Sequence, residues 1–266
     1  MGSPEIPKIG KTPERQEQIA SPAELAWKNI EAQVAARLRE LFNEVHDTRR
    51  YEENEQGARI EKLQNNEKVF FTKVVAGVEE ARQQHEQVTV LFDVDETLAK
   101  HVYKSDNTSR TFLRPSAVPL MEFLKNTYQS NLGLFTSRGG LEKQLENAEL
   151  LAALKPYMDT SLLFSTRDYP LFGSDSIEFG KNLLRDFGGE HGIVDDALVD
   201  PDPFNRPGAM GDIDKLQCLK LIREKLPEGA VVIVDDMVYP EILSRKNGLY
   251  GVSLNWMKGD SGVFHL

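Results

Sequence analysis

The most regular pattern along the chain is a set of short apolar runs, each ended abruptly by polar residues. Residues 88–92 form such a run and lead directly into Asp93 and Asp95, and residues 132–135 and 230–234 repeat the arrangement. Continuous apolar runs of this length are typical of buried strands in a parallel sheet. The expected strands are 88–92, 132–135, 161–165, 230–234 and 249–254.

Helical spacing of apolar residues dominates the first third of the chain. Residues 21–24, Ser-Pro-Ala-Glu, have the form of a helix start, with Ser as N-cap and Glu three residues later. The pattern predicts a disordered lead-in over 1–21 and a helical arm over 22–86, made of two helices or one long bent helix. It leaves open whether this arm packs on the rest of the protein or mediates self-association or partner docking, because sustained heptads are not evident.

Strands alternate with helical patterns over residues 87–266, which predicts one α/β domain with a mostly parallel central sheet. A polar segment after residue 99 suits a small hairpin flap. Helices are expected over 119–126 and 141–157 and from Gly211 onward. Residues 166–211, rich in Pro, Gly and Asp, are expected to form an irregular insertion.

Composition and charge narrow the function classes. The chain has 266 residues, a formal net charge of −10 and one cysteine. The negative charge argues against broad nucleic-acid or anionic-membrane binding, and a single cysteine excludes an intrachain disulfide framework. Cys218 falls on the apolar face of an expected helix, which favours a packing role. Without an apolar signal core or membrane-length apolar run, the expected location is cytoplasmic.

Asp93 and Asp95 carry the first chemical signal. Two carboxylates at the end of a buried strand are unfavourable unless a cation or a proton neutralises them, and Mg²⁺ would do so. Both side chains share one side only if the strand is still extended at Asp95. If the chain loops after Asp93, Asp95 instead comes over the first carboxylate.

Residues 93–97, Asp-Val-Asp-Glu-Thr, resemble the DxDx[TV] motif of the haloacid dehalogenase (HAD) superfamily, in its aspartate-based phosphatase branch. The resemblance implies a Rossmann-like fold, Mg²⁺ as cofactor, Asp93 as nucleophile and Asp95 as general acid and base. Thr97 of the same motif is a candidate substrate-binding residue. The presence of Asp95 argues against dehalogenase chemistry.

Three later segments match the remaining motifs of this family in order. Thr136 follows a strand and is the expected phosphate-binding hydroxyl, with Ser137 and Arg138 as secondary candidates. Lys215, in the first turn of a helix, is the expected catalytic lysine, with Lys220 and Lys181 as rivals. The implied metal ligands are Asp93, the backbone carbonyl of Asp95, Asp235 and Asp236.

Arg114 and Pro115, followed by an expected helix, resemble the small-cap branch of this superfamily that includes phosphatases of the RNA polymerase C-terminal domain, the NLI-interacting-factor-like branch. This resemblance makes Arg114 a further substrate-binding candidate. A small flap would leave the site open to a bulky substrate, so a phosphoprotein is the expected partner. Alternatives are a phosphatase for nucleotides or nucleic-acid ends, and a catalytically quiet phosphate-binding or scaffold module.

The expected insertion also contains an acidic cluster. Its members are Asp195, Asp196, Asp200 and Asp202. A second metal site and a solvated loop are both consistent with this composition, and the solvated loop is favoured.

Overall fold

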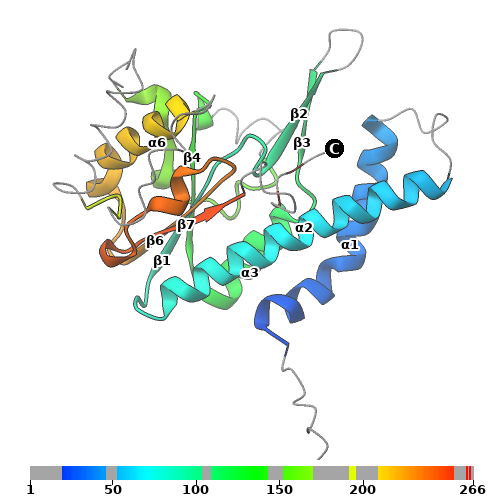
Figure 1. The fold of residues 1–266 in the computed structure, drawn as a ribbon, viewed down its shortest axis with the longest axis horizontal. Helices are drawn as coiled ribbons and strands as arrows, with labels where there is room; N and C mark the ends of the chain where they lie inside the picture. Colours follow the sequence, from blue (N-terminus) through cyan, green and yellow to red (C-terminus); the bar gives the residue numbers. More distant parts are fainter. Residues whose placement is uncertain are drawn as a thin grey trace, which may run out of the picture.

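The chain is described from a computed structural model, shown in Figure 1. The structure describes residues 20–45, 53–103, 109–142, 152–169, 192–195 and 209–254, together with Gly262 and Phe264. Statements about the fold refer to these residues.

A parallel sheet of five strands forms the centre of the molecule, in the order β5-β4-β1-β6-β7. The strands are β1 (Val88–Phe92), β4 (Asn131–Thr136), β5 (Leu163–Ser165), β6 (Ala230–Asp235) and β7 (Leu249–Ser253). This confirms the predicted α/β, Rossmann-like fold and its expected strands. β5 is shorter than predicted, because residues Thr160–Leu162 form a 3-10 turn in which the Ser161 backbone amide donates to the Asp159 carboxylate (2.9 Å).

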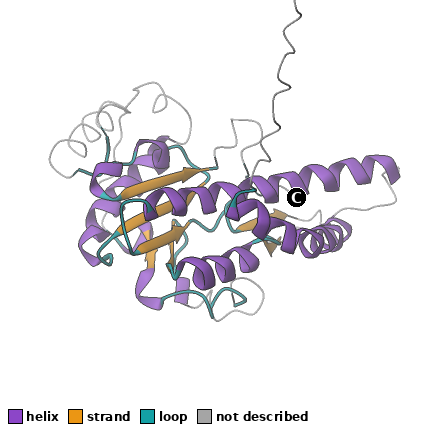
Figure 2. Cartoon of the chain, turned by 90° about the horizontal axis from the view of Figure 1, so that it is seen from below, coloured by secondary structure: helices purple, strands orange, loops and turns teal. Residues whose placement is uncertain are grey.

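Helices cover both faces of the sheet, as Figures 1 and 2 show. Helices α2 (Glu53–Arg82) and α3 (Ala117–Tyr128) lie on one face, and α6 (Ala209–Ile222) lies on the other. Alternation along β1 sends Val90 and Phe92 toward α2 and α3, and Leu91 toward α6. β1 therefore contributes side chains to an apolar core on each face of the sheet, which explains why its sequence is continuously apolar.

The N-terminal arm consists of two helices, α1 (Pro22–Val45) and α2. The predicted capping box is present: the Ser21 amide donates to the Glu24 carboxylate (2.9 Å), and the Glu24 amide donates to Ser21 Oγ (3.2 Å). α2 contacts the sheet and α1 packs on α2, so that Trp27 of α1 meets Phe71 edge to face at 5.8 Å. None of the described helices combines the length and the apolar character needed to span a bilayer.

The expected flap is an antiparallel hairpin of β2 (Ala99–Tyr103) and β3 (Ser109–Leu113), separate from the main sheet. It stands beside the C-terminal half of α1 in Figure 1. Phe112 of the flap packs with Leu41 of α1 and with Phe264, and Arg110 forms an ion pair with Glu44. The flap is thus held against the N-terminal arm as well as against the core.

The region after β4 departs from the predictions. The helix expected over 141–157 is wrong at its end, because residues 152–157 form turns, and residues 143–151 lie outside the described part of the chain. Of the expected insertion, residues 170–191 and 196–208 also lie outside it. The described remainder includes Val194, which makes an isolated antiparallel bridge to Leu243.

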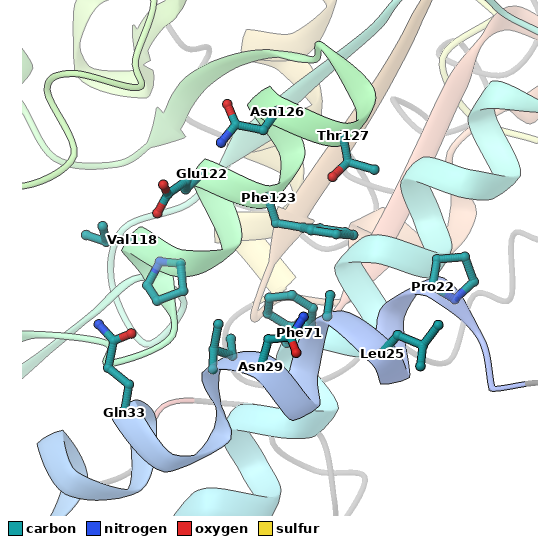
Figure 3. A pocket seen from close by; sticks show the side chains of 13 residues that line it. Pro22, Leu25, Asn29, Gln33, Phe71, Val118, Glu122, Phe123, Asn126 and Thr127 are labelled. Atoms are coloured by element: carbon teal, nitrogen blue, oxygen red, sulfur yellow. The ribbon is translucent and has the colours of Figure 1, made fainter.

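A groove of about 530 Å³ runs between α1 and α3, as Figure 3 shows. Its floor is Phe71 of α2, and its walls include Leu25, Ile30 and Phe123. Leu25 is 52% exposed. The arm therefore covers one face of the sheet without closing completely over α3.

A buried ion pair joins the arm to the segment between the flap and α3. Glu67 of α2 accepts hydrogen bonds from the amide (3.0 Å) and hydroxyl (2.5 Å) of Ser116, and lies 3.6 Å from Arg114 Nε. Arg114 donates to the carbonyl of Gly262 (2.7 Å) and stacks on Phe70 with its guanidinium carbon 3.9 Å from the ring centroid. Burial raises the pKa of Glu67 and lowers the pKa of Arg114 to about 10.

We expect Glu67→Ala to reduce the free energy of unfolding by about 3–5 kcal/mol, because it leaves the buried Arg114 guanidinium without its counter-charge. Urea unfolding would measure the loss. Glu61→Ala is the matched control, since Glu61 is an exposed residue of the same helix. Equal losses for the two variants would contradict a stabilising role for the pair.

Candidate metal and phosphate site

Asp93 and Asp235 are brought together by the alternation of adjacent strands. The ladder between β1 and β6 continues past Phe92, since the Asp93 amide donates to the carbonyl of Val234 (2.8 Å). Asp93 therefore has the orientation of Leu91, toward α6, and Asp235 has the orientation of Ile233 on the same side. Both carboxylates emerge at the carboxyl ends of central strands, where open α/β sheets bind ligands.

Lys215 of α6 lies between these two carboxylates and is 1% exposed. Its Nζ donates to Asp93 Oδ1 (2.8 Å), to Asp235 Oδ2 (2.9 Å) and to the Phe135 carbonyl at the end of β4 (2.8 Å). An ammonium has three N–H donors, so all of them are used. Burial alone would lower the pKa of Lys215, but attraction to Asp235 and Asp93 outweighs it and the pKa is raised.

Asp235 is held at both oxygens. Besides Lys215, Oδ2 accepts a hydrogen bond from the Tyr239 hydroxyl (2.9 Å), and Oδ1 accepts one from the Met237 amide (3.0 Å). The loop that supplies these donors is fixed by Asp212, whose buried Oδ1 accepts the amides of Val238 (3.0 Å) and Tyr239 (2.9 Å). The orientation of Asp235 thus depends on α6 through both Lys215 and Asp212.

Asp236 completes an acidic group with Asp93 and Asp235, in which one oxygen from each residue lies within 4.8 Å of the others. Burial raises the pKa of Asp93 most strongly. The Lys215 charge lowers this pKa and the Asp235 charge raises it, and the net result is a pKa of about 6. Burial and the neighbouring charges of Asp235 and Asp93 raise the pKa of Asp236 to about 9. One lysine therefore does not neutralise the three carboxyl groups, and their hard oxygen donors fit a hard divalent cation.

Asp95 lies on a turn rather than on the strand. The Val94 carbonyl accepts the amides of Leu98 (2.9 Å) and Ala99 (2.8 Å), so the chain loops immediately after Asp93. Of the two predicted geometries, the looped one is therefore correct. Arg138 donates two hydrogen bonds to the Asp95 carboxylate, from Nε to Oδ2 (2.8 Å) and from Nη2 to Oδ1. The acidic group found in the structure does not include the Asp95 carboxylate.

Glu96 adopts a left-handed backbone conformation with φ of 58° within this turn. Its carbonyl accepts the amide of Phe264 (2.9 Å), and its carboxylate pairs with Lys100 of the flap. A non-glycine residue with positive φ is costly unless its surroundings fix it. The contact with Phe264 and the ion pair with the flap supply that restraint beside Asp95.

The predicted hydroxyl residues take different positions. Thr136 is fully buried at the end of β4, and its Oγ1 accepts the Arg138 amide at 3.3 Å. Ser137 is exposed immediately after the strand. Thr97 is fully buried, and among the described residues its hydroxyl has no hydrogen-bond partner.

The remaining sequence candidates are placed as follows. Lys215 contacts Asp93, whereas Lys220 is exposed on the same helix and Lys181 lies outside the described residues. Arg114 is buried against α2 and is bound there by the contacts described above. Of the predicted acidic cluster, Asp195 is described and its amide donates to the Ile242 carbonyl (2.9 Å), while Asp196, Asp200 and Asp202 are not described.

Sequence reasoning missed two residues of the site, Asp212 and Tyr239. An aspartate in the first turn of a helix is ordinarily explained by the helix dipole, so Asp212 carries no distinct signal. Tyr239 lies four residues after Asp235 in a segment without a regular pattern. Burial and the Asp235 charge raise its pKa well above the ordinary value, so its hydroxyl remains a donor.

Fold and site together define a Rossmann-like α/β protein with an acidic group that can hold a metal ion at the carboxyl ends of its central strands. Comparison of the chain with protein-family models, with curated proteins and with solved structures finds no match.

We expect Asp236→Asn to stabilise the protein in the absence of divalent cations. The Asp236 pKa is 3.8 ordinarily and about 9 in the folded protein, so between these values the folded state keeps a proton that the unfolded chain has lost. Stability therefore falls as pH rises through this window. The variant lacks this loss and should be more stable than wild type by at least about 2 kcal/mol near the top of the window.

Urea unfolding in chelator, repeated across this pH window, would measure the difference. Glu228→Gln, a charge removal at an exposed position, is the control and should follow wild type at every pH. Added divalent cation should stabilise wild type more than Asp236→Asn. Parallel pH profiles for wild type and Asp236→Asn would contradict the assignment of Asp236 to the acidic group.

Proposed function

We propose that the protein is a Mg²⁺-dependent phosphomonoester hydrolase that acts through an aspartyl-phosphate intermediate. The observation that supports this most directly is the convergence of Asp93, Asp235 and Lys215 from separate elements on one buried point. Such an arrangement makes a carboxylate nucleophile available beside a cation site. The HAD resemblance of the same residues points to the same chemistry.

Asp93, Asp235 and Asp236 would hold the cation. Bound there, Mg²⁺ would neutralise the repulsion between an anionic nucleophile and an anionic phosphate and would stabilise charge in the transition state. The resemblance adds the Asp95 backbone carbonyl as a further ligand.

In the first step, the Asp93 carboxylate attacks phosphorus in line and forms an acyl phosphate. The bond from phosphorus to the leaving oxygen breaks, and Asp95 gives its proton to that oxygen. Lys215 keeps Asp93 oriented and balances charge on Asp93 and Asp235 throughout. The role of Thr136 would be to hold a phosphoryl oxygen at the end of β4.

In the second step, water attacks the same phosphorus and Asp95 takes a proton from it. The bond between phosphorus and Asp93 breaks, which releases inorganic phosphate and restores the carboxylate. Asp95 can gain or lose a proton only at an oxygen that does not accept a hydrogen bond from Arg138. Its hydrogen bonds to Arg138 must therefore break before each proton transfer.

The proposed substrates are bulky molecules such as phosphoproteins. The element inserted between β1 and α3 includes only a two-stranded hairpin among the described residues, which favours access by a large molecule. Nucleotides or nucleic-acid ends are the alternative substrates, and a quiet phosphate-binding module is the alternative class of protein.

We expect wild type to hydrolyse p-nitrophenyl phosphate in Mg²⁺ and to lose this activity in chelator. Asp93→Asn should reduce the rate at least about a thousandfold, because an amide is a poor nucleophile for phosphorus. A colorimetric assay of released nitrophenol would measure both effects.

The matched control is Asp159→Asn, the same change at the opposite, amino end of β5, where asparagine can also cap the turn. It should retain wild-type turnover. Turnover that survives Asp93→Asn would show that the nucleophile is wrong. A folded wild type without turnover at any pH would favour the phosphate-binding module.

A further inference from the structure

Arg138 and Asp95 form a pair at the exposed edge of the site. Both oxygens of Asp95 accept hydrogen bonds from the guanidinium. The side chain of Arg138 is 18% exposed and that of Asp95 is 48% exposed, so solvent reaches the pair. The backbone of Arg138 is anchored separately, because its amide donates to Thr136 Oγ1.

Lys215, the other cation of the site, is poorly suited to receive a phosphate. Its three donors are already bound to Asp93, Asp235 and the Phe135 carbonyl, and its side chain is 2% exposed. Contact with a phosphate would require it to release a buried carboxylate, which is costly. Among the described cations that pair with the acidic residues of the site, Arg138 is the one with solvent access.

Guanidinium geometry suits an exchange of anions. The planar fork that binds a carboxylate through two parallel hydrogen bonds binds a phosphate in the same way. Because solvent reaches the pair, separating it costs less than separating a buried pair, and the doubly charged phosphate supplies a new partner for the guanidinium. Arg138 lies two residues past the end of β4, which runs parallel to β1, so it stands at the same carboxyl end of the sheet as Asp93.

We propose that Arg138 is an exchange residue, which binds the Asp95 carboxylate in the free protein and transfers its two hydrogen bonds to the phosphate group when substrate arrives. This inference rests on the proposed function. The exchange frees both oxygens of Asp95 at the moment when a leaving group is present. The freed carboxylate takes up a proton from solvent before it serves as the general acid, so recognition of phosphate is coupled to the activation of Asp95.

The exchange predicts that removal of Asp95 improves phosphate binding. Inorganic phosphate, titrated calorimetrically in Mg²⁺, should bind Asp95→Ala about tenfold more tightly than wild type, because Arg138 no longer has to leave a carboxylate. Arg138→Met should bind at least about tenfold more weakly than wild type. The phosphate affinity of Arg138→Lys should lie between those of wild type and Arg138→Met, since lysine keeps the charge but not the planar pair of donors.

The double variant Asp95→Ala/Arg138→Met separates exchange from simple charge removal. Under the exchange, the gain from Asp95→Ala disappears when Arg138 is absent. Glu96→Gln removes a charge from the adjacent residue, whose partner is Lys100 rather than Arg138, and should leave phosphate affinity within about threefold of wild type.

Each outcome decides between the proposals. An equal gain from Asp95→Ala with and without Arg138 would overturn the exchange, as would wild-type phosphate affinity in Arg138→Met. In both cases the proposed hydrolase function stands if p-nitrophenyl phosphate is still turned over. Failure of every folded variant to bind phosphate would overturn the exchange, and absence of turnover in wild type would then overturn the hydrolase function too.

Discussion

The site depends on one buried ammonium between two buried carboxylates. Asp93, Asp235 and Lys215 are each at most 6% exposed, and taking such charges out of water costs several kcal/mol per ion unless the geometry compensates. The compensation here comes from three hydrogen bonds that Lys215 donates, one of them to the main chain of β4. Strands β1, β4 and β6 and helix α6 are thereby tied to a single atom. Any shift of α6 along the sheet would leave at least one of these charges without its partner.

The rest of the structure serves this arrangement in layers. Alternation along β1 and β6 sends both aspartates toward α6, and the loop after β6 is fixed by Asp212 and Tyr239. On the other face, α2 contributes Glu67, which holds Arg114 and the start of α3. Phe264 then meets the turn that carries Asp95. Leu41 of the arm packs on Phe264, whose amide donates to the Glu96 carbonyl, so the arm is connected through Phe264 to the turn that carries Asp95.

Sequence reasoning predicted the parallel sheet, the flap and the two-helix arm because each has a local pattern: apolar runs, a polar hairpin segment and a capping box. It also placed Asp93, Lys215, Asp235 and Asp236 at element ends that the sheet brings together. It could not predict contacts made across the sequence by single side chains. No periodic pattern in the sequence marks Tyr239 or the hydrogen bonds from Arg138 to Asp95. The choice between the two geometries of Asp95 depended on the hydrogen bonds that the Val94 carbonyl accepts. The prediction of a helix over 141–157 was wrong at its end because the turns at 152–157 have the same spacing of apolar residues as a helix.

The charge balance of the site constrains the order in which ligands can bind. Asp93, Asp95, Asp235 and Asp236 face two cations, Lys215 and Arg138, and burial already raises the pKa of Asp93 and Asp236 because their charges are not fully compensated. A phosphate dianion that arrived first would add repulsion to this group. A divalent cation that arrived first would displace the retained protons and remove the repulsion, which would make the proposed binding of phosphate favourable. Under the proposed exchange, phosphate would then compete with Asp95 alone for Arg138, since all three donors of Lys215 are already used. In the proposed reaction, the same excess of carboxylates that favours a cation would therefore also leave Arg138 as the group that receives the phosphate.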